Sequence, residues 1–357
     1  MSSLQPHLLD HAYSVAARQV EAGTVPFAIL GIADAEGVVR LEAFSPRSGP
    51  SIGTDAICLL ASITKPITGT LVTRMAQDGR LSLAQPLATW LPELAAAPDR
   101  QAVTAWHVLT HTTGMADADI EEIVTRGAGR DELLRHAFSA PHETPIGSTF
   151  RYVTSTFDLL AEAVERIEGR PFEDVLRAEI LDPLGMTDTT FDPRSTRRER
   201  MAPVTVGRWD GAGATMDPAA AQVLLERFVD LRFAGGGLWS TASDLLRFGR
   251  AMLRSGELEG TRILAPAFVE MATREVTLHG LGATPNRLED DHYALGWGKP
   301  GPASPASPMA FEHGGVSGTR LWVDPAYDLV VVYLSGRWGL ASTETDRVVN
   351  AVYAALE

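Results

Sequence analysis

The pattern of apolar and polar positions predicts β-strands at both ends of the chain. Residues 26–33 and 38–44 are apolar runs joined by Asp-Ala-Glu-Gly, a combination that favours a hairpin turn. Three further strand-like runs lie near the other end, at residues 310–313, 319–323 and 329–334. We expect the hairpin to pair with these strands in one antiparallel sheet.

Two amphipathic helices flank these strands. The first has one apolar face and ends at Gly23; the face consists of Leu8, Ala12, Val15 and Ala16. The second runs from Ser342 to Leu356 and has its own apolar face. The sheet is therefore expected to carry a helix from each end of the chain.

The middle of the chain has helical periodicity, with Pro and Gly between the segments. The predicted helices are residues 67–77, 105–109, 155–167, 172–181 and 241–253. Together these elements predict an α+β fold with an inserted all-helical domain. We expect residues 1–77 and 286–357 to form an α/β domain, residues 78–285 to form the helical domain, and the active site to lie between the two.

Composition narrows the kinds of partner. At 357 residues the chain exceeds the size at which a single hydrophobic core keeps growing. A composition of 45% hydrophobic and 21% charged residues is typical of a globular protein. The formal net charge of -14 disfavours nucleic acid and anionic membranes, and no long basic run offsets it. A small molecule is the expected partner; the oligomeric state is left open.

The same sequence offers little to a metal or cofactor. His107 and His111 have helical spacing but lack the glutamate of a His-Glu-x-x-His site, and no Gly-rich phosphate loop follows a strand. Cys58 is the only cysteine and lies in an apolar run, so we expect an inert core thiol. We therefore expect neither a cofactor nor a metal. The first residues lack the pattern of an export signal, so we expect a cytoplasmic protein.

The stretch LLASITKPITG, residues 59–69, carries the candidate chemistry. Pro66 is tolerated only in the first turn of a helix, which places Ser62 at the helix N-terminus. Unpaired N–H groups there favour a developing negative charge. Residues three apart share a helical face, so the Lys65 amine can reach the Ser62 hydroxyl.

The alternative is that Ser62 caps the helix and Lys65 is a solvated charge. Against it, Lys65 and Lys299 are the only lysines, and 20 serines with two lysines give only about 0.1 chance matches to Ser-x-x-Lys. A buried lysine can also lose its proton and act as a base, whereas an arginine cannot. We therefore interpret Ser62 as a nucleophile.

Ser51 is a rival nucleophile, because Gly49 to Gly53 match Gly-x-Ser-x-Gly. That motif works only where a strand precedes the serine and a helix follows it. Here Pro46 and Pro50 stiffen a loop, and an extended run follows. The sequence context thus argues against Ser51.

Further motifs follow Ser62-x-x-Lys65 in a characteristic order: LTHTTGM (109–115), Tyr152-Val153-Thr154, GGGLWSTASDLLRF (235–248) and His313-Gly314-Gly315. In this set the chain resembles the serine β-lactamase and penicillin-binding-protein superfamily. The likeness is closest to class C enzymes and to the esterases of that fold, the family VIII carboxylesterases. The ordered set is far more specific than any single motif.

The resemblance implies a role for each motif. Ser62 would be acylated, Lys65 would be its base, and Tyr152 would pass a proton to the leaving group; without the motif, Tyr152 would be read as a core residue. The N–H groups of Ser62 and Val316 would bind the oxyanion. The remaining implied substrate-binding residues, which line the site from a strand and a loop, are His313, Gly314, Gly315 and Thr154. His111 would be a buried structural histidine.

Two departures from the superfamily pattern point to substrate class. Thr154 replaces an asparagine, which removes an amide that could bind both Lys65 and an acylamide side chain. His313 replaces a lysine, which removes a permanent cation facing a substrate carboxylate. Both changes fit a carboxylesterase for neutral esters with short acyl groups.

Other functions remain open on the same residues. A β-lactam or D-amino-acid amide hydrolase, or an acyltransferase, would use the same Ser-Lys-Tyr site, and a non-catalytic binding module would keep only the fold. Three aromatic residues near the Gly-rich stretch are either pocket lining or plain core: Trp209, Phe233 and Trp239.

Overall fold

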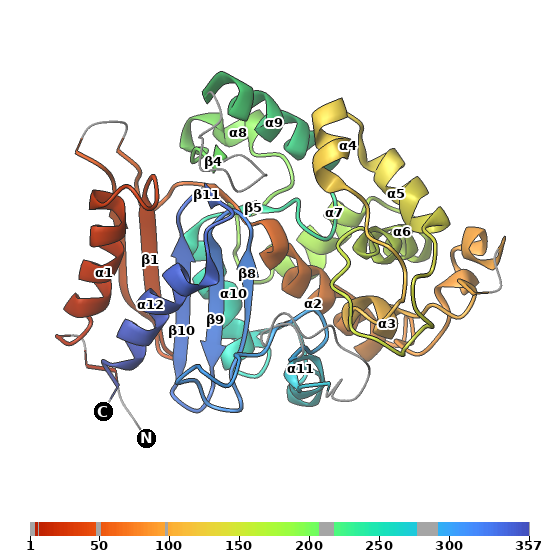
Figure 1. Cartoon of the computed structure of the whole chain (residues 1–357). Helices are drawn as coiled ribbons and strands as arrows, with labels where there is room; N and C mark the ends of the chain where they lie inside the picture. Colours follow the sequence, from red (N-terminus) through yellow and green to blue (C-terminus); the bar gives the residue numbers. More distant parts are fainter. Residues whose placement is uncertain are drawn as a thin grey trace.

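A computed structural model describes residues 4–5, 7–47, 51–96, 99–206, 218–276 and 292–356. The five longest strands are β1 (Ala28–Ala33), β2 (Val38–Phe44), β8 (Phe311–Gly315), β9 (Thr319–Asp324) and β10 (Leu329–Leu334). They form one antiparallel sheet in the order β2-β1-β10-β9-β8. Helices α1 (Asp10–Glu21) and α12 (Ser342–Tyr353) lie side by side on one face of it (Figure 1).

The N-terminal hairpin pairs with the C-terminal strands as the sequence predicts. In this register Ile29 of β1 lies opposite Leu334 of β10, and Ala33 lies opposite Val330. The two ends of the chain thus meet at the middle of the sheet. The predicted α+β fold, with an antiparallel sheet between terminal helices, is confirmed.

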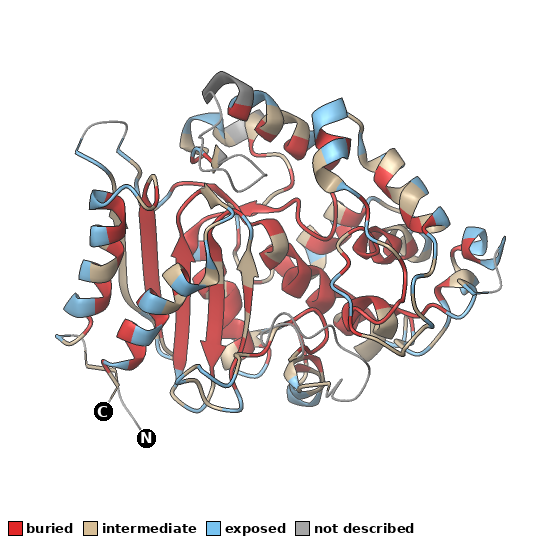
Figure 2. Ribbon diagram, in the orientation of Figure 1, coloured by how far each residue is buried: buried red, intermediate tan, exposed pale blue. Residues whose placement is uncertain are grey.

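Strands β1 and β10 are buried along their whole length, because both faces of the sheet are covered (Figure 2). Leu30 and Tyr333 belong to the core beneath α1 and α12. Their neighbours Ile29 and Val332 belong to the larger core on the opposite face. This two-sided burial explains why the sequence of these strands reads as continuous apolar runs rather than as an alternation.

Helix α10 (Ala242–Leu253) covers that opposite face. A Cβ built on Gly249 would lie 2.5 Å from Val330 Cγ1, and one on Gly31 would lie 2.9 Å from Leu246 Cδ1. Helix α10 lies within residues 78–285, the predicted helical domain, and its apolar face packs on the sheet. Periodicity alone predicts the helix but not the surface on which it docks.

The helices between residues 105 and 176 gather beside the sheet, beyond α2 (Thr64–Gln77) (Figure 1). Three match predicted segments: α3 (Ala105–Leu109), α6 (Phe157–Glu168) and α7 (Phe172–Leu176), the last continued by a π-helical turn, Arg177–Leu181. The prediction missed five others: α4 (Ile120–Arg126), α5 (Arg130–Ser139), α8 (Arg194–Arg197), α9 (Pro218–Leu231) and α11 (Pro266–Thr273).

Short strands complete the described part of the chain. They pair as β3 (Cys58–Leu59) with β5 (Trp239–Ser240), β4 (Thr205–Val206) with β11 (Arg337–Trp338), and β6 (Glu257–Leu258) with β7 (Thr261–Arg262). The pair β3–β5 links the segment just before Ser62 to the Gly-rich stretch. The predicted boundary at residues 285 and 286 lies outside the described residues, and the two-domain division stays a prediction.

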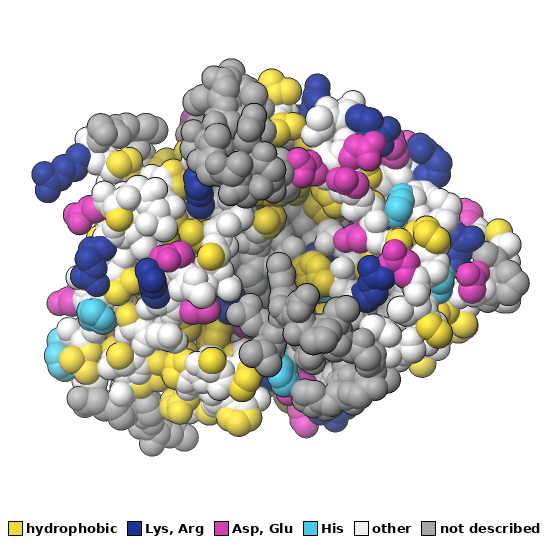
Figure 3. Space-filling view, viewed as in Figure 1, with side chains coloured by type: hydrophobic (Ala, Val, Ile, Leu, Met, Phe, Trp, Pro, Cys, Tyr) yellow, Lys and Arg dark blue, Asp and Glu magenta, His cyan; other side chains and the backbone are white. Residues whose placement is uncertain are grey.

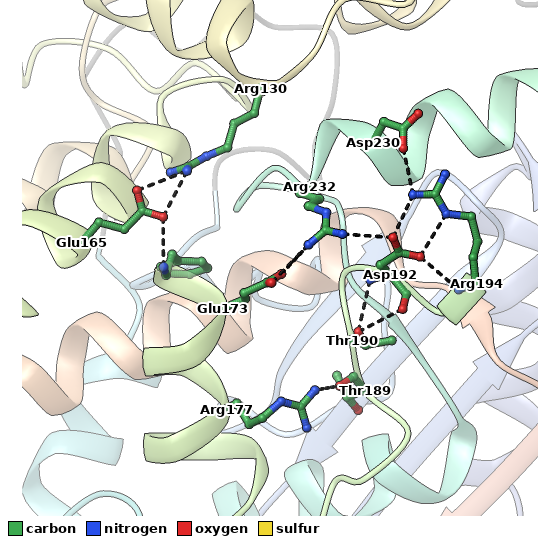
Figure 4. Close-up of polar contacts among 11 residues, drawn as sticks. Arg130, Glu165, Glu173, Arg177, Thr189, Thr190, Asp192, Arg194, Asp230 and Arg232 are labelled. Atoms are coloured by element: carbon green, nitrogen blue, oxygen red, sulfur yellow. Dashed lines mark hydrogen bonds and ion pairs between the residues drawn. The ribbon is translucent and has the colours of Figure 1, made fainter. Parts of the chain in front are cut away.

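An ion-pair network fixes the segment that follows α7 (Figure 4). Asp192 accepts hydrogen bonds from Arg194 and Arg232, each at 2.8–2.9 Å, and Arg232 also pairs with Glu173 of α7 at 3.1 Å. The Arg194 guanidinium holds the pKa of Asp192 below its usual range. The Arg232 guanidinium at the end of α9 thereby joins α7 to the segment that contains Asp192.

Surface charge is mixed on the visible face, where Lys and Arg side chains lie singly among Asp and Glu (Figure 3). None of the described helices combines the length and the apolar character that crossing a bilayer requires. Within the same residues, no group of three or more His, Cys, Asp or Glu side chains is placed to hold a metal ion.

The contact between α10 and the sheet predicts a cost for Gly249→Ala. Although alanine favours a helix, its Cβ would overlap Val330, so we expect the free energy of unfolding to fall by about 1–3 kcal/mol. Gly37→Ala is the matched control, because a Cβ there meets nothing within 4 Å. Equilibrium denaturation of both variants tests this; a Gly249→Ala protein as stable as the parent would contradict the packing.

Candidate active site

The backbone turns sharply just before Ser62. Ala61 has φ +48°, a left-handed conformation that is uncommon for a residue with a Cβ, and Ala61–Ile63 form a single 3-10 turn that leads into α2. The Thr64 hydroxyl stabilises this turn, since it donates to the Ala61 carbonyl at 2.7 Å and accepts from the Leu238 N–H at 3.1 Å. Ser62 therefore lies half-buried at the head of the helix, with Pro66 in the first turn as predicted.

Lys65 is fully buried, and its amine faces Ser62. The Nζ atom lies 2.8 Å from the Gly235 carbonyl oxygen and 3.3 Å from both Ser62 Oγ and Thr154 Oγ1. Burial lowers the pKa of Lys65 to about 7, against the opposing pull of the Asp117 and Asp158 carboxylates. A large share of this amine is consequently uncharged at neutral pH.

Tyr152 packs on the other side of the same amine. Lys65 Nζ lies 4.6 Å from the centroid of the Tyr152 ring and 5.4 Å from that of Phe157. Tyr152 is 39% exposed. The structure thus brings together the three residues that the sequence singles out, Ser62, Lys65 and Tyr152.

Thr154 retains the lysine contact that its replacement of asparagine was expected to remove. Its hydroxyl accepts the hydrogen bond from Lys65, and its backbone N–H donates to Asp117 at 2.8 Å. The expectation is wrong on this point, because a hydroxyl on this loop reaches the amine as an amide oxygen would. The second hydrogen-bonding group of the amide is still missing.

Gly235 and Asp158 are site residues that the sequence reasoning missed. A Cβ on Gly235 would lie 2.6 Å from the Thr154 carbonyl oxygen, so only glycine lets this backbone approach both Thr154 and Lys65. The run of three glycines was the available signal. Asp158 is fully buried 3.4 Å from Arg130, and burial raises the pKa of its carboxyl to about 7; nothing in the sequence pattern marked it.

The strand β8 approaches the backbone that precedes Ser62. A Cβ on Gly315 would lie 2.2 Å from the Leu60 carbonyl oxygen, and the Thr319 hydroxyl donates to that same oxygen at 3.0 Å. Val316, 42% exposed, follows in the turn to β9. This contact places the predicted oxyanion residues, Ser62 and Val316, on neighbouring segments.

Gly314 and His313 face opposite sides of β8. A Cβ on Gly314 would point towards Arg320, 3.5 Å away on the face covered by α12, so Gly314 can offer the site only its backbone. His313 points the other way and is buried, with its ring 6.3 Å from that of Tyr152. The predicted strand motif is therefore split between the two faces.

His313 is held in one neutral form. Its Nδ1 lies 2.7 Å from the Gly314 carbonyl, which can only accept, so Nδ1 carries the proton. Its Nε2 then accepts from the Tyr293 hydroxyl at 2.8 Å. Burial, with Lys65 adding to it, lowers the pKa of His313 to about 3. Tyr293 was not predicted, because it lies far from every motif along the chain.

The remaining candidates lie outside this cluster. Ser51 is exposed in a loop that β3 follows, so it lacks the helix that a nucleophile elbow needs. Burial raises the pKa of the Cys58 thiol to about 12, which confirms an inert core cysteine. Phe233 and Trp239 are buried core residues, and Trp209 lies outside the described residues.

Known proteins are similar to this chain in sequence and in fold. The sequence profile of the family described as Beta-lactamase matches residues 14–355. Esterase EstB of Burkholderia gladioli is 29% identical, over 86% of this chain and 85% of its own.

Two solved structures share the fold. EstCE1, described as a hydrolase with promiscuous acyltransferase activity, superposes with a TM-score of 0.79 at 21% identity, over 98% of this chain and 99% of its own. A family VIII carboxylesterase superposes with a TM-score of 0.78 at 18% identity, over 99% of each chain.

The geometry predicts that His313 stays neutral across the physiological range. Between about pH 8 and about pH 5 its imidazole should keep one proton, on Nδ1, because its pKa lies near 3. Long-range nitrogen–proton NMR spectra of histidine-labelled protein measure this, with His313→Gln assigning the resonance. A His313 signal that titrates near pH 6 would contradict the hydrogen bonds described.

Proposed function

The chain belongs to the β-lactamase family of serine hydrolases, and from this premise we propose that it cleaves neutral carboxylic esters with short acyl groups through an acyl-enzyme on Ser62. The observation that carries the proposal is the buried Lys65 amine, 3.3 Å from Ser62 Oγ and with its pKa lowered to about 7. An uncharged amine at that distance can accept the hydroxyl proton as the serine attacks.

In the acylation step, Ser62 Oγ bonds to the ester carbonyl carbon and its proton passes to Lys65. The carbonyl electron pair moves to the oxygen, which the N–H groups of Ser62 and Val316 stabilise. The tetrahedral intermediate then expels the alcohol, and the departing oxygen takes a proton from Tyr152. Lys65 returns its proton to Tyr152, which leaves both groups as they began.

Deacylation repeats these transfers with water as the nucleophile. Water attacks the acyl carbonyl and gives one proton to Tyr152 while the phenol proton passes to Lys65. When the second intermediate collapses, Tyr152 gives a proton to Ser62 Oγ and takes one back from Lys65. The products are the carboxylic acid and the free enzyme. The proton transfers in both steps run between the side chains of Ser62, Lys65 and Tyr152.

The preference for neutral esters follows from the neutral state of His313. This ring stands where the superfamily carries a lysine, and both of its nitrogens are engaged within the protein. It therefore provides no permanent positive charge for a substrate carboxylate. Thr154, with a hydroxyl in place of an amide, likewise offers less to an acylamide side chain than asparagine would.

Amide hydrolysis and acyl transfer are the competing activities of the same site. Turnover of p-nitrophenyl butyrate, a chromogenic cephalosporin and a D-alanyl amide distinguishes the hydrolytic alternatives, and we expect the ester to react fastest. Faster turnover of the cephalosporin would reverse this assignment. Product analysis with an added alcohol measures how much acyl group is transferred instead of hydrolysed.

Ser62→Ala should abolish ester hydrolysis, with a loss of at least about 10³-fold, because no other hydroxyl replaces the nucleophile. A fluorophosphonate should label the parent protein on the peptide that contains Ser62, as located by mass spectrometry. Ser51→Ala is the matched control and should leave both activity and labelling intact. Retained activity in Ser62→Ala would refute the proposed nucleophile.

The pH dependence of catalysis should report Lys65. Because the uncharged amine is the base, kcat/KM for p-nitrophenyl butyrate should rise about tenfold per pH unit at low pH and level off above about pH 7. Stopped-flow or steady-state rates across this range measure the profile. An acidic limb that extends to about pH 10, the range of an exposed lysine, would contradict a buried base.

A further inference from the structure

His111 lies in the LTHTTGM segment and holds the backbone on one side of Tyr152. It is 1% exposed and has φ +55°, a left-handed conformation that histidine and asparagine adopt more readily than most residues. In this conformation its carbonyl oxygen accepts a hydrogen bond from the Arg151 N–H at 2.8 Å. The residue just before Tyr152 is thereby fixed.

The ring of His111 holds the other side. Its Nδ1 accepts a hydrogen bond from the Val153 N–H at 3.0 Å, which requires an unprotonated Nδ1. Burial, together with the nearby Lys65 and His313, keeps the pKa of His111 well below its usual range. The acceptor is therefore present at neutral pH, and the residue just after Tyr152 is fixed as well.

The same ring packs against the phenol itself. The centroids of the His111 and Tyr152 rings are 4.4 Å apart, with the planes tilted by 31°. The imidazole also meets Tyr293 edge to face, with centroids 4.8 Å apart, and the Phe157 ring at 5.5 Å, so it is packed among aromatic rings. Although Tyr152 is 39% exposed, its ring thus packs against the buried ring of His111.

The same segment also holds the residues that follow. Asp117 accepts the N–H of Thr154 at 2.8 Å through one carboxylate oxygen and that of Ser155 at 2.9 Å through the other. The loop that carries Tyr152 and Thr154 is therefore bound to residues 111–117 through four of its backbone N–H groups. Loops move more than helices, so a proton donor on a loop needs such hydrogen bonds to keep its position.

We propose that His111 is the positioning residue of Tyr152: its carbonyl and Nδ1 fix the backbone on both sides of the tyrosine, and its ring supports the phenol. This goes beyond a purely structural role, and it rests on the proposed function, in which Tyr152 protonates the departing alcohol. A misplaced phenol would slow that proton transfer more than it would slow attack by Ser62.

The leaving group provides the readout. An alkyl alcohol departs only with a proton, whereas p-nitrophenolate departs without one, so loss of the proton donor penalises an alkyl ester selectively. The experiment measures kcat/KM for ethyl butyrate and for p-nitrophenyl butyrate in the same preparation. The ratio of the two is independent of how much of a variant is folded, and thermal melting reports stability separately.

Three variants test the proposal. Tyr152→Phe sets the reference, with a ratio of ethyl to p-nitrophenyl ester that falls about tenfold or more. His111→Phe keeps a ring but has no acceptor for Val153, and its ratio should fall in the same direction. His111→Asn carries an acceptor at the position of Nδ1 and tolerates the left-handed backbone, so its ratio should stay closer to that of the parent.

An unchanged ratio in both His111→Phe and His111→Asn would overturn the proposal, and so would a fall that is equal in the two. If His111→Phe yields no folded protein, His111→Gln replaces it, because its acceptor lies one bond further out; ratios equal to those of His111→Asn then count against positioning. Failure of the proposed function itself is distinguishable, since it would appear as activity in Ser62→Ala.

Discussion

Burial of the Lys65 amine is the interaction on which the site depends. Removing a positive charge from water is costly, and the amine responds by binding its proton less tightly. Nζ keeps hydrogen-bonding partners in this buried position, the Ser62 and Thr154 hydroxyls and the Gly235 carbonyl, and none of these three groups carries a charge that would hold its proton. The result is a base at neutral pH beside a hydroxyl that needs one.

The scaffold serves this arrangement by bringing distant backbones unusually close. Gly315 allows β8 to approach Leu60, and Gly235 allows the Gly-rich stretch to approach Thr154 and Lys65. A side chain at either position would overlap backbone atoms, which do not yield as side chains do. On the other side of the site, four backbone hydrogen bonds hold the loop that carries Tyr152.

Local sequence patterns predicted the features that local interactions determine. The sheet strands, the terminal helices and Ser62 at a helix start followed from periodicity and from Pro66, and the resemblance to the β-lactamase family is confirmed. Docking depends on surfaces far apart in sequence, which is why periodicity predicted α10 but not its packing on the sheet. The sequence did not identify Tyr293 and Asp158 as site residues for the same reason: both are buried beside residues that only the fold brings near.

The protonation state of Lys65 tests the account most directly. Because Lys65 and Lys299 are the only lysines, NMR of protein labelled with ¹³C at the lysine ε-carbons gives two signals, and Lys299→Arg identifies the one from Lys65. The account predicts that this signal titrates at about pH 7. Titration at the value of an exposed lysine, about 10.4, would contradict it and remove the base from the proposed reaction.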